Sequence, residues 1–140
     1  MSSNYKILSH TADIAAEIEA DSLEELFREA FNFWLNSVAE IETFDFEDEI
    51  EINLKADSLE QLLVDFLNEV NFLLIVKNIL CVEIKNLKID TEKKLLHTSL
   101  NVQNLKDISL LKEEIKSVTY HQMEIRNKKD KYQVKVVFDI

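Results

Sequence analysis

The chain has 140 residues, the size of one domain (residues 1–140), and a formal net charge of −11 from 27 acidic and 16 basic side chains. Its hydrophobic content of 46% is enough for a buried core and too high for a disordered tail. The acidic balance argues against strong direct binding of nucleic acid, because phosphate binding needs a basic surface. It favours docking on the basic surface of a partner.

The scarce residue types exclude several classes of site. The chain has no glycine and no proline, which removes the glycine-rich phosphate loops and the glycine-flanked serine of many hydrolases. Turns must then be made by Asn, Asp and Lys. The single cysteine, Cys81, excludes an internal disulfide and a cysteine-built zinc site. A polar start and the lack of a run of about 20 apolar residues predict a cytoplasmic protein without a membrane span.

A strand followed by a helix is predicted twice in the first half of the chain. The segment Ala20–Leu26, ADSLEEL, returns as Ala56–Leu62, ADSLEQL. Alternating apolar residues precede each copy, over Ile14–Ala20 and Ile50–Ala56. Alternation is the period of a half-buried strand. The repeat therefore predicts a duplicated strand–helix unit.

Each repeated segment also carries the start signal of a helix. A side-chain oxygen of Asp21 or Ser22, and of Asp57 or Ser58, can cap the first free N–H groups. Apolar residues at spacings of three and four then predict one buried stripe per helix. The stripes are Leu23, Leu26, Phe27, Ala30, Phe31 and Trp34, and Leu59, Leu62, Leu63, Phe66, Leu67 and Val70. Packing is the expected role of Phe31 and Trp34, with a ligand platform as the alternative.

The second half of the chain predicts strands. They cover Cys81–Ile84, Lys88–Ile89 and Leu96–Val102, and then a final hairpin of Val118–Arg126 and Tyr132–Asp139. Strands that adjoin in sequence favour antiparallel pairing. The order of elements predicts a two-layer α+β fold, with two helices packed on one face of a mixed or antiparallel sheet.

Carboxylates near the two ends of the chain are the best candidates for a binding site. Asp13 lies where an opening strand breaks, and Asp139 lies in an apolar strand that runs to Ile140. If that strand is docked, the Asp139 side chain and the terminal carboxylate of Ile140 are held together. Fixed hard oxygens attract Ca²⁺ or Mg²⁺. A turn-capping role is the simpler alternative for Asp13.

Five segments, in their order and spacing, resemble the archease family. They are HTADI at 10–14, SLEELF at 22–27, LLVDFLNE at 62–69, KSVTYH at 116–121 and VFDI at 137–140. The resemblance covers the chain from about residue 5 onward. At two positions where the family usually has glycine, this chain has Ala15 and Gln122.

The resemblance implies an α+β domain of strand–helix–strand–strand type and an accessory protein that is not itself an enzyme. Archeases help RtcB-type RNA ligases, which join RNA ends in tRNA splicing and repair. They promote guanylylation of the ligase histidine and allow multiple turnovers, while the ligase uses GTP and divalent metal.

The resemblance also implies which residues carry this role. The family's metal site maps onto Asp13, Asp139 and the terminal carboxylate of Ile140. Calcium is the first expectation for the cation, with magnesium or manganese as alternatives. Lys116 matches a lysine that the family associates with activation, and an exposed strand lysine without such a role is the alternative.

Two other functions stay open at this point. One is a general chaperone or interaction module that needs no metal. The other is a metal-dependent enzyme that acts on nucleotide or RNA directly, which the missing phosphate loops and the low basic content disfavour. The oligomeric state is not indicated by the sequence.

Overall fold

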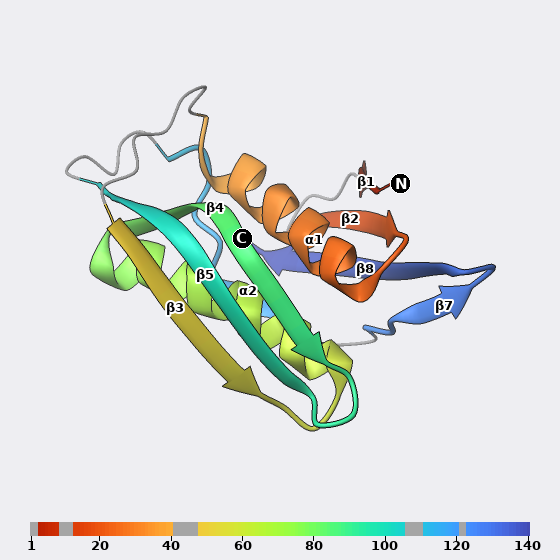
Figure 1. Ribbon diagram of the computed structural model, residues 1–140. Helices are drawn as coiled ribbons and strands as arrows, with labels where there is room; N and C mark the ends of the chain where they lie inside the picture. Colours follow the sequence, from red (N-terminus) through yellow and green to blue (C-terminus); the bar gives the residue numbers. More distant parts are fainter. Residues whose placement is uncertain (1–2, 9–12, 41–47, 106–110, 121–122) are drawn as a thin grey trace.

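The fold places two helices among antiparallel strands, as the computed structural model shows for residues 3–8, 13–40, 48–105, 111–120 and 123–140 (Figure 1). The elements are β1 (Asn4–Leu8), β2 (Asp13–Ala20), α1 (Leu23–Val38), β3 (Asp48–Lys55), α2 (Leu59–Lys77), β4 (Ile79–Asp90), β5 (Leu95–Asn104), β6 (Ser117–Thr119), β7 (Arg126–Lys128) and β8 (Lys131–Asp139). This order confirms the predicted strand–helix repeat, as β2–α1 and β3–α2.

The strands form two sheets. One has the order β1-β2-β8-β6, with β7 also paired to β8, and the other has the order β3-β5-β4. All of these pairs are antiparallel. The pairing of β2 with β8 brings the first and last parts of the described chain side by side.

The helices lie between the two sheets. Helix α1 contacts β2 and β8 of one sheet and β4 of the other, and α2 contacts β3 and β4 on one side and β6 on the other. The predicted α+β class, with two helices packed on antiparallel strands, is confirmed. The strands divide into two sheets, so each helix is covered on two sides and not on one.

The buried residues explain why both sheets are needed. Every residue of the predicted stripe of α1 is at most 5% exposed, and so are Phe33 and Val38 outside that stripe. Phe33 stacks on Phe138 of β8, with ring centroids 4.6 Å apart, whereas Phe31 faces Phe66 of α2. Phe31 and Trp34 are buried, which confirms packing as their role. Within the described residues, no helix is long and apolar enough to cross a membrane.

The helix starts confirm the predicted caps. Ser22 precedes α1 and its hydroxyl accepts a hydrogen bond from the Glu25 N–H at 3.1 Å. Ser58 does the same for Gln61 before α2, also at 3.1 Å. Both serines are extended, with φ of −140° and −145°, which is the usual backbone conformation of a helix N-cap.

The turns are made by the residue types that the glycine-free sequence predicts. The described residues with positive φ are Asn78, Lys94, Lys129 and Asp130. Asn78 ends α2 in the left-handed conformation, and Lys129 and Asp130 form the two-residue turn between β7 and β8. Positive φ at both central positions, 53° and 64° here, is the pattern of a type I′ turn. Ala15, where the family resemblance leads us to expect glycine, lies in the regular ladder of β2 between Leu8 and Val137.

The predicted final hairpin is wrong in its first strand. Val118–Arg126 is not one strand: β6 pairs with the end of β8, and β7 pairs with its beginning. Between them, the described residues 120 and 123–125 have no strand conformation. Part of this connection bonds to α2, because the Ile125 N–H donates to Glu60 at 2.9 Å.

Removal of the α1 cap should lower stability by a defined amount. Ser22→Ala removes the acceptor of the Glu25 N–H, and we expect the free energy of unfolding to fall by about 1 kcal/mol. Urea denaturation measures the change. Ser22→Asp is the matched control, because it keeps an acceptor and should stay near the parent. Equal stability of the alanine variant and the parent would contradict the assigned cap.

Candidate functional site

The two predicted acidic residues lie opposite each other. Asp13 is the first residue of β2 and Asp139 is the last residue of β8, and the antiparallel register pairs them directly. Facing residues in such a pair have Cβ atoms about 4.5–5.5 Å apart on the same side of the sheet. Asp139 is exposed, whereas Asp13 is partly buried and its Oδ1 atom is buried. One carboxylate is thus set into the surface and the other faces solvent.

Strand β6 brings the predicted lysine to the same place. Ser117 faces Asp139 from the side opposite Asp13, so Asp13, Asp139 and Ser117 form one row across three strands. The Lys116 N–H donates to the Asp139 carbonyl at 2.8 Å. The exposed Lys116 is therefore adjacent to the acidic pair, although the two are 23 residues apart in the chain (139 − 116).

The end of β8 is docked as the sequence predicts. Phe138 is fully buried against Phe33, and Ile140 is partly buried against the hydrophobic core. Apolar anchors on both sides of Asp139 hold its backbone. The main chain of Ile140 follows directly after the acidic pair, so its position in the fold is constrained too.

The row that contains Asp13 and Asp139 can be compared with a second row on the same face of the sheet, at Glu17 of β2. There, Lys6, Glu17 and Lys135 face one another across β1, β2 and β8, with alternating charge. At the end of the sheet, Asp13 faces Asp139 and the charges are alike. Like charges directly opposite each other are destabilising in a sheet, so a cation bound here would offset that repulsion.

The donor atoms fit a hard divalent cation. The side chains of Asp13 and Asp139 offer oxygen ligands of the kind that Ca²⁺ and Mg²⁺ take, and the main chain of Ile140 lies next to them. The described residues contain no group of three or more His, Cys, Asp or Glu side chains placed to hold a metal. The third ligand in this set would be a main-chain group.

The histidines do not add to this set where they are described. His97 is on β5, in the other sheet, and its Nδ1 lies 2.7 Å from Asn53 Oδ1. His10 and His121 lie outside the described residues, as do Thr11 and Ala12 of the first archease-like segment and Gln122, which follows the fourth.

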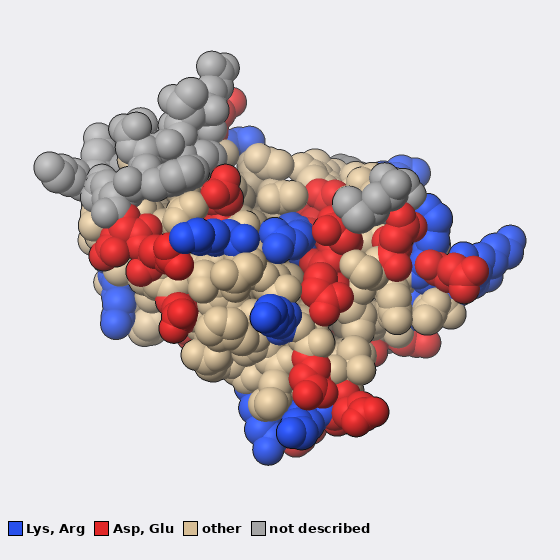
Figure 2. All heavy atoms as spheres, in the orientation of Figure 1, with Lys and Arg blue, Asp and Glu red and all other residues tan. Residues whose placement is uncertain are grey.

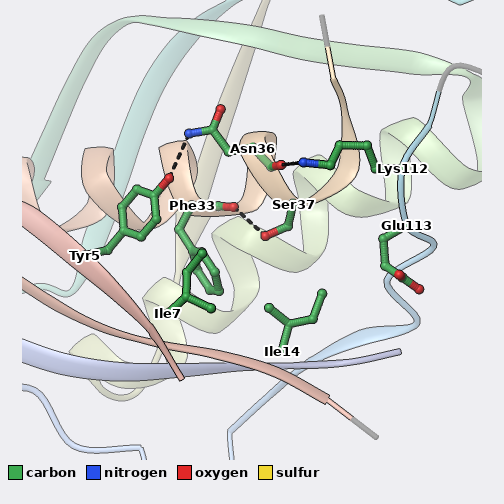
Figure 3. Close-up of a pocket in the computed structure, with 8 residues that line it drawn as sticks. All are labelled: Tyr5, Ile7, Ile14, Phe33, Asn36, Ser37, Lys112 and Glu113. Atoms are coloured by element: carbon green, nitrogen blue, oxygen red, sulfur yellow. Dashed lines mark hydrogen bonds between the residues drawn. The ribbon is translucent and has the colours of Figure 1, made fainter. Parts of the chain in front are cut away.

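A pocket of about 260 Å³ lies on the helix side of the sheet, at the start of β2 (Figure 3). Ile7, Ile14 and Phe33 give it an apolar wall, and Ile14 directly follows Asp13. Its polar groups bond to one another: Asn36 Nδ2 donates to the Tyr5 hydroxyl at 2.9 Å, and Lys112 Nζ donates to the Asn36 carbonyl at 3.1 Å. This lining suits an apolar side chain better than a charged substrate.

Two polar residues of α2 were missed by the sequence reading. Asn68 Oδ1 accepts from the Val118 N–H at 2.9 Å, and Asn71 Nδ2 donates to the Ile115 carbonyl at 2.7 Å. Both bonds hold the segment that contains Lys116. The signal was present as two asparagines three residues apart in a helix that is otherwise apolar over Phe66–Val76 apart from Glu69, because buried polar side chains need partners.

The charge distribution agrees with the acidic composition. Figure 2 shows clusters of acidic side chains among uncharged surface on one face, together with basic groups, and basic side chains with acidic ones beside them at the projecting tip of the β7–β8 hairpin. That hairpin carries Lys128, Lys129 and Lys131. The face shown has no continuous basic track of the kind that holds a nucleic-acid backbone.

Comparisons with known proteins agree on one family. The Archease protein family (MTH1598/TM1083) matches residues 5–140. The chain is 35% identical to an archease of Methanosarcina barkeri, over 97% of this chain and 95% of the relative. It is 30% identical to an archease of the fish Ictalurus punctatus, over 97% of this chain and 85% of the relative.

Solved structures support the same assignment. The crystal structure of an archease, possible chaperone, from Thermotoga maritima has a TM-score of 0.63 at 30% identity, over 96% of each chain. The solution structure of protein 1598 from Methanobacterium thermoautotrophicum shares the fold, with a TM-score of 0.78 at 24% identity, over 97% of this chain and 98% of that one.

The fold and site define a small α+β protein with two helices between antiparallel sheets and facing carboxylates at one end. The chain belongs to the archease family.

Neutralising one acid of the pair should stabilise the protein when divalent cations are removed. In EDTA, we expect Asp139→Asn to raise the free energy of unfolding by about 0.2–1 kcal/mol, because it removes a facing like charge. The gain should shrink at high salt. Glu51→Gln is the control, since Glu51 is an exposed strand acid that faces the neutral Ser99. A gain of the same size in the control would assign the effect to net charge.

The buried thiol of Cys81 should be inert and should make stability fall at high pH. Burial, with a smaller effect of Glu69, raises the pKa of Cys81 from 9.0 to about 12. Between these values the unfolded thiol releases its proton and the folded thiol keeps it. The free energy of unfolding should therefore fall, by at most about 1.4 kcal/mol per pH unit, as pH rises above 9.0.

Unfolding titrations of the parent and of Cys81→Ala at pH 8 to pH 11 measure this dependence. The variant should lose the part of the slope that comes from the thiol. A thiol reagent at pH 8 should react only after denaturant is added. Rapid reaction of the folded protein would contradict the burial of Cys81.

Proposed function

We propose that this archease is an accessory protein of an RtcB-type RNA ligase. It promotes guanylylation of the ligase and allows the ligase to complete multiple turnovers. Family membership supports an accessory role. The single observation that carries the finer proposal is the pairing of Asp13 with Asp139 beside Lys116. That surface combines oxygen donors with one cationic side chain, and it is the surface we assign to the contact with the ligase.

In this proposal Asp13, Asp139 and the Ile140 carboxylate hold a divalent cation, with calcium as the first candidate and magnesium or manganese as the others. When bound, the cation supplies positive charge that offsets the facing carboxylates and can coordinate oxygen atoms of a partner. Asp13 gives the inner ligand, because its Oδ1 is buried, and the exposed Asp139 faces the partner. Lys116 supplies a flexible point charge to an anionic group of the ligase or its nucleotide.

The mechanism is a shift between states of the ligase. An accessory protein can favour the guanylylation-competent state only if it binds that state more tightly than the others. The acidic surface of the chain, with its formal net charge of −11, favours encounter with a basic partner. RNA is then handled by the ligase and not by this chain.

The alternative of a metal-independent chaperone is favoured by one observation. The related crystal structure is described as that of a possible chaperone. A chaperone role predicts that neither the acidic pair nor a bound cation matters for the effect on a client. Measurement of cation binding together with ligation therefore separates the two functions.

A ligation assay with an RtcB-type ligase at limiting concentration tests the proposal. The parent chain should raise the reaction from one turnover to many. Asp139→Asn, and a short polar extension after Ile140 that removes its carboxylate, should return it to one turnover. Each change should also weaken Ca²⁺ binding at least about tenfold, as loss of site residues generally does.

The controls are Glu51→Gln and the same extension placed before Met1, both of which should keep full stimulation. Normal stimulation by both Asp139→Asn and the chain extended after Ile140 would contradict the proposed site. Stimulation that persists in EDTA, without measurable cation binding, would favour the chaperone function. Turnover by the chain without any ligase would make it an enzyme.

A further inference from the structure

One segment of the chain is bonded on one side to strand β8 and on the other side to side chains of helix α2. We call the described residues 111–120 and 123–125 the Lys116 segment, and their strand is the three-residue β6. Helix α2 bonds to the main chain of this segment through Asn71 to Ile115, Asn68 to Val118 and Glu60 to Ile125. The three side chains are at spacings of eight and three residues, so they share one face of α2.

The bonds of Asn71 are buried and continue to the other helix. Asn71 is 4% exposed and Trp34 is fully buried. Asn71 Oδ1 accepts from Trp34 Nε1 at 3.0 Å, and its Nδ2 donates to the Ile115 carbonyl at 2.7 Å. Both ends of the amide are therefore used, and the orientation of the amide is fixed. A buried series of hydrogen bonds of this kind favours one geometry, because any other arrangement would leave a buried polar group without a hydrogen bond, at a cost in free energy.

On its other side, the Lys116 segment contacts the strand that carries Asp139 of the acidic pair. The Lys116 N–H donates to the Asp139 carbonyl at 2.8 Å, and Ser117 faces Asp139 in the register. Lys116 and Ser117 thus lie between the Ile115 bond to Asn71 and the Val118 bond to Asn68. The place of Asp139 relative to Asp13 depends on the pairing of β8 with β2, and the place of Lys116 relative to both depends on β8 together with α2.

We propose that Asn68 and Asn71 are positioning residues for the acidic pair and Lys116. They fix the main chain at residues 115–118, and this sets the distance at which Lys116 and the end of β8 meet. The inference rests on the function proposed above for that surface. It assigns a part in that function to a helix face that is remote from the partner.

Asn68 allows the sharpest test, because one substitution keeps its bond and another of similar size removes it. Asn68→Asp retains an oxygen that can accept from the Val118 N–H, whereas Asn68→Leu does not. Asn68 is only partly buried, so both variants should fold. If the leucine variant does not fold, Asn68→Ala removes the same acceptor with less steric change.

Amide hydrogen exchange on the full chain gives the first result, with no ligase or metal present. We expect Asn68→Leu to speed exchange about tenfold or more at Val118 and at Lys116, and to leave the amides of β4 and β5 unchanged. Asn68→Asp should stay close to the parent at all of these positions. Faster exchange at Val118 alone, with Lys116 unchanged, would overturn the proposal, because the bond would then be only local.

Calcium titration and multiple-turnover ligation give the second result. The leucine variant should bind Ca²⁺ about tenfold more weakly and stimulate the ligase less, and the aspartate variant should restore both. Full stimulation by the leucine variant, despite fast exchange at Lys116, would overturn the positioning role. If the parent chain itself neither binds Ca²⁺ nor stimulates, the proposed function fails, and the positioning of the Lys116 segment is then decided by exchange alone.

Discussion

The pairing of β2 with β8 is the constraint on which the candidate site depends. It runs without interruption from Asp13 opposite Asp139 to Ala20 opposite Tyr132. Side chains alternate between the two faces of a strand, so a slip of one residue would move Ile14, Phe138 and their neighbours out of the core. The burial of Ala16, Ile18 and Val136 on the helix side therefore sets the position of the two acids on the other side. The same register of β2 with β8 therefore determines both the packing of the core and the geometry of the candidate site.

The helices make this register possible by filling the space between two sheets. Helix α1 contacts β2 and β8 directly, and α2 supports β6. The Trp34–Asn71 bond joins the two helices in the buried layer. The helix layer is connected to the strands that carry the candidate site by two sets of contacts, Phe33 with Phe138 and Asn71 with Ile115.

Much of the fold could be predicted from local signals. The caps at Ser22 and Ser58 and the apolar stripes are local patterns, and the structure confirms them. The turn residues followed from the absence of glycine. The division into two sheets could not be predicted. Alternating apolar residues show that one face of a strand is buried, but they do not show which helix that face covers. The break between β6 and β7 was missed because this part of the chain bonds to α2. Such a tertiary contact leaves no periodic pattern in the sequence.

For the candidate site, Asp13 and Asp139 could be named from the sequence, but their pairing needed the register. Their chemistry follows from a conflict within the sheet. The row of Lys6, Glu17 and Lys135 shows that this face can place opposite charges together, yet the row at its end places two acids together. A protein gains no stability from that arrangement. Local choices that oppose the fold occur mainly at functional positions, and a cation or a basic partner is what would turn the unfavourable pair into a favourable one.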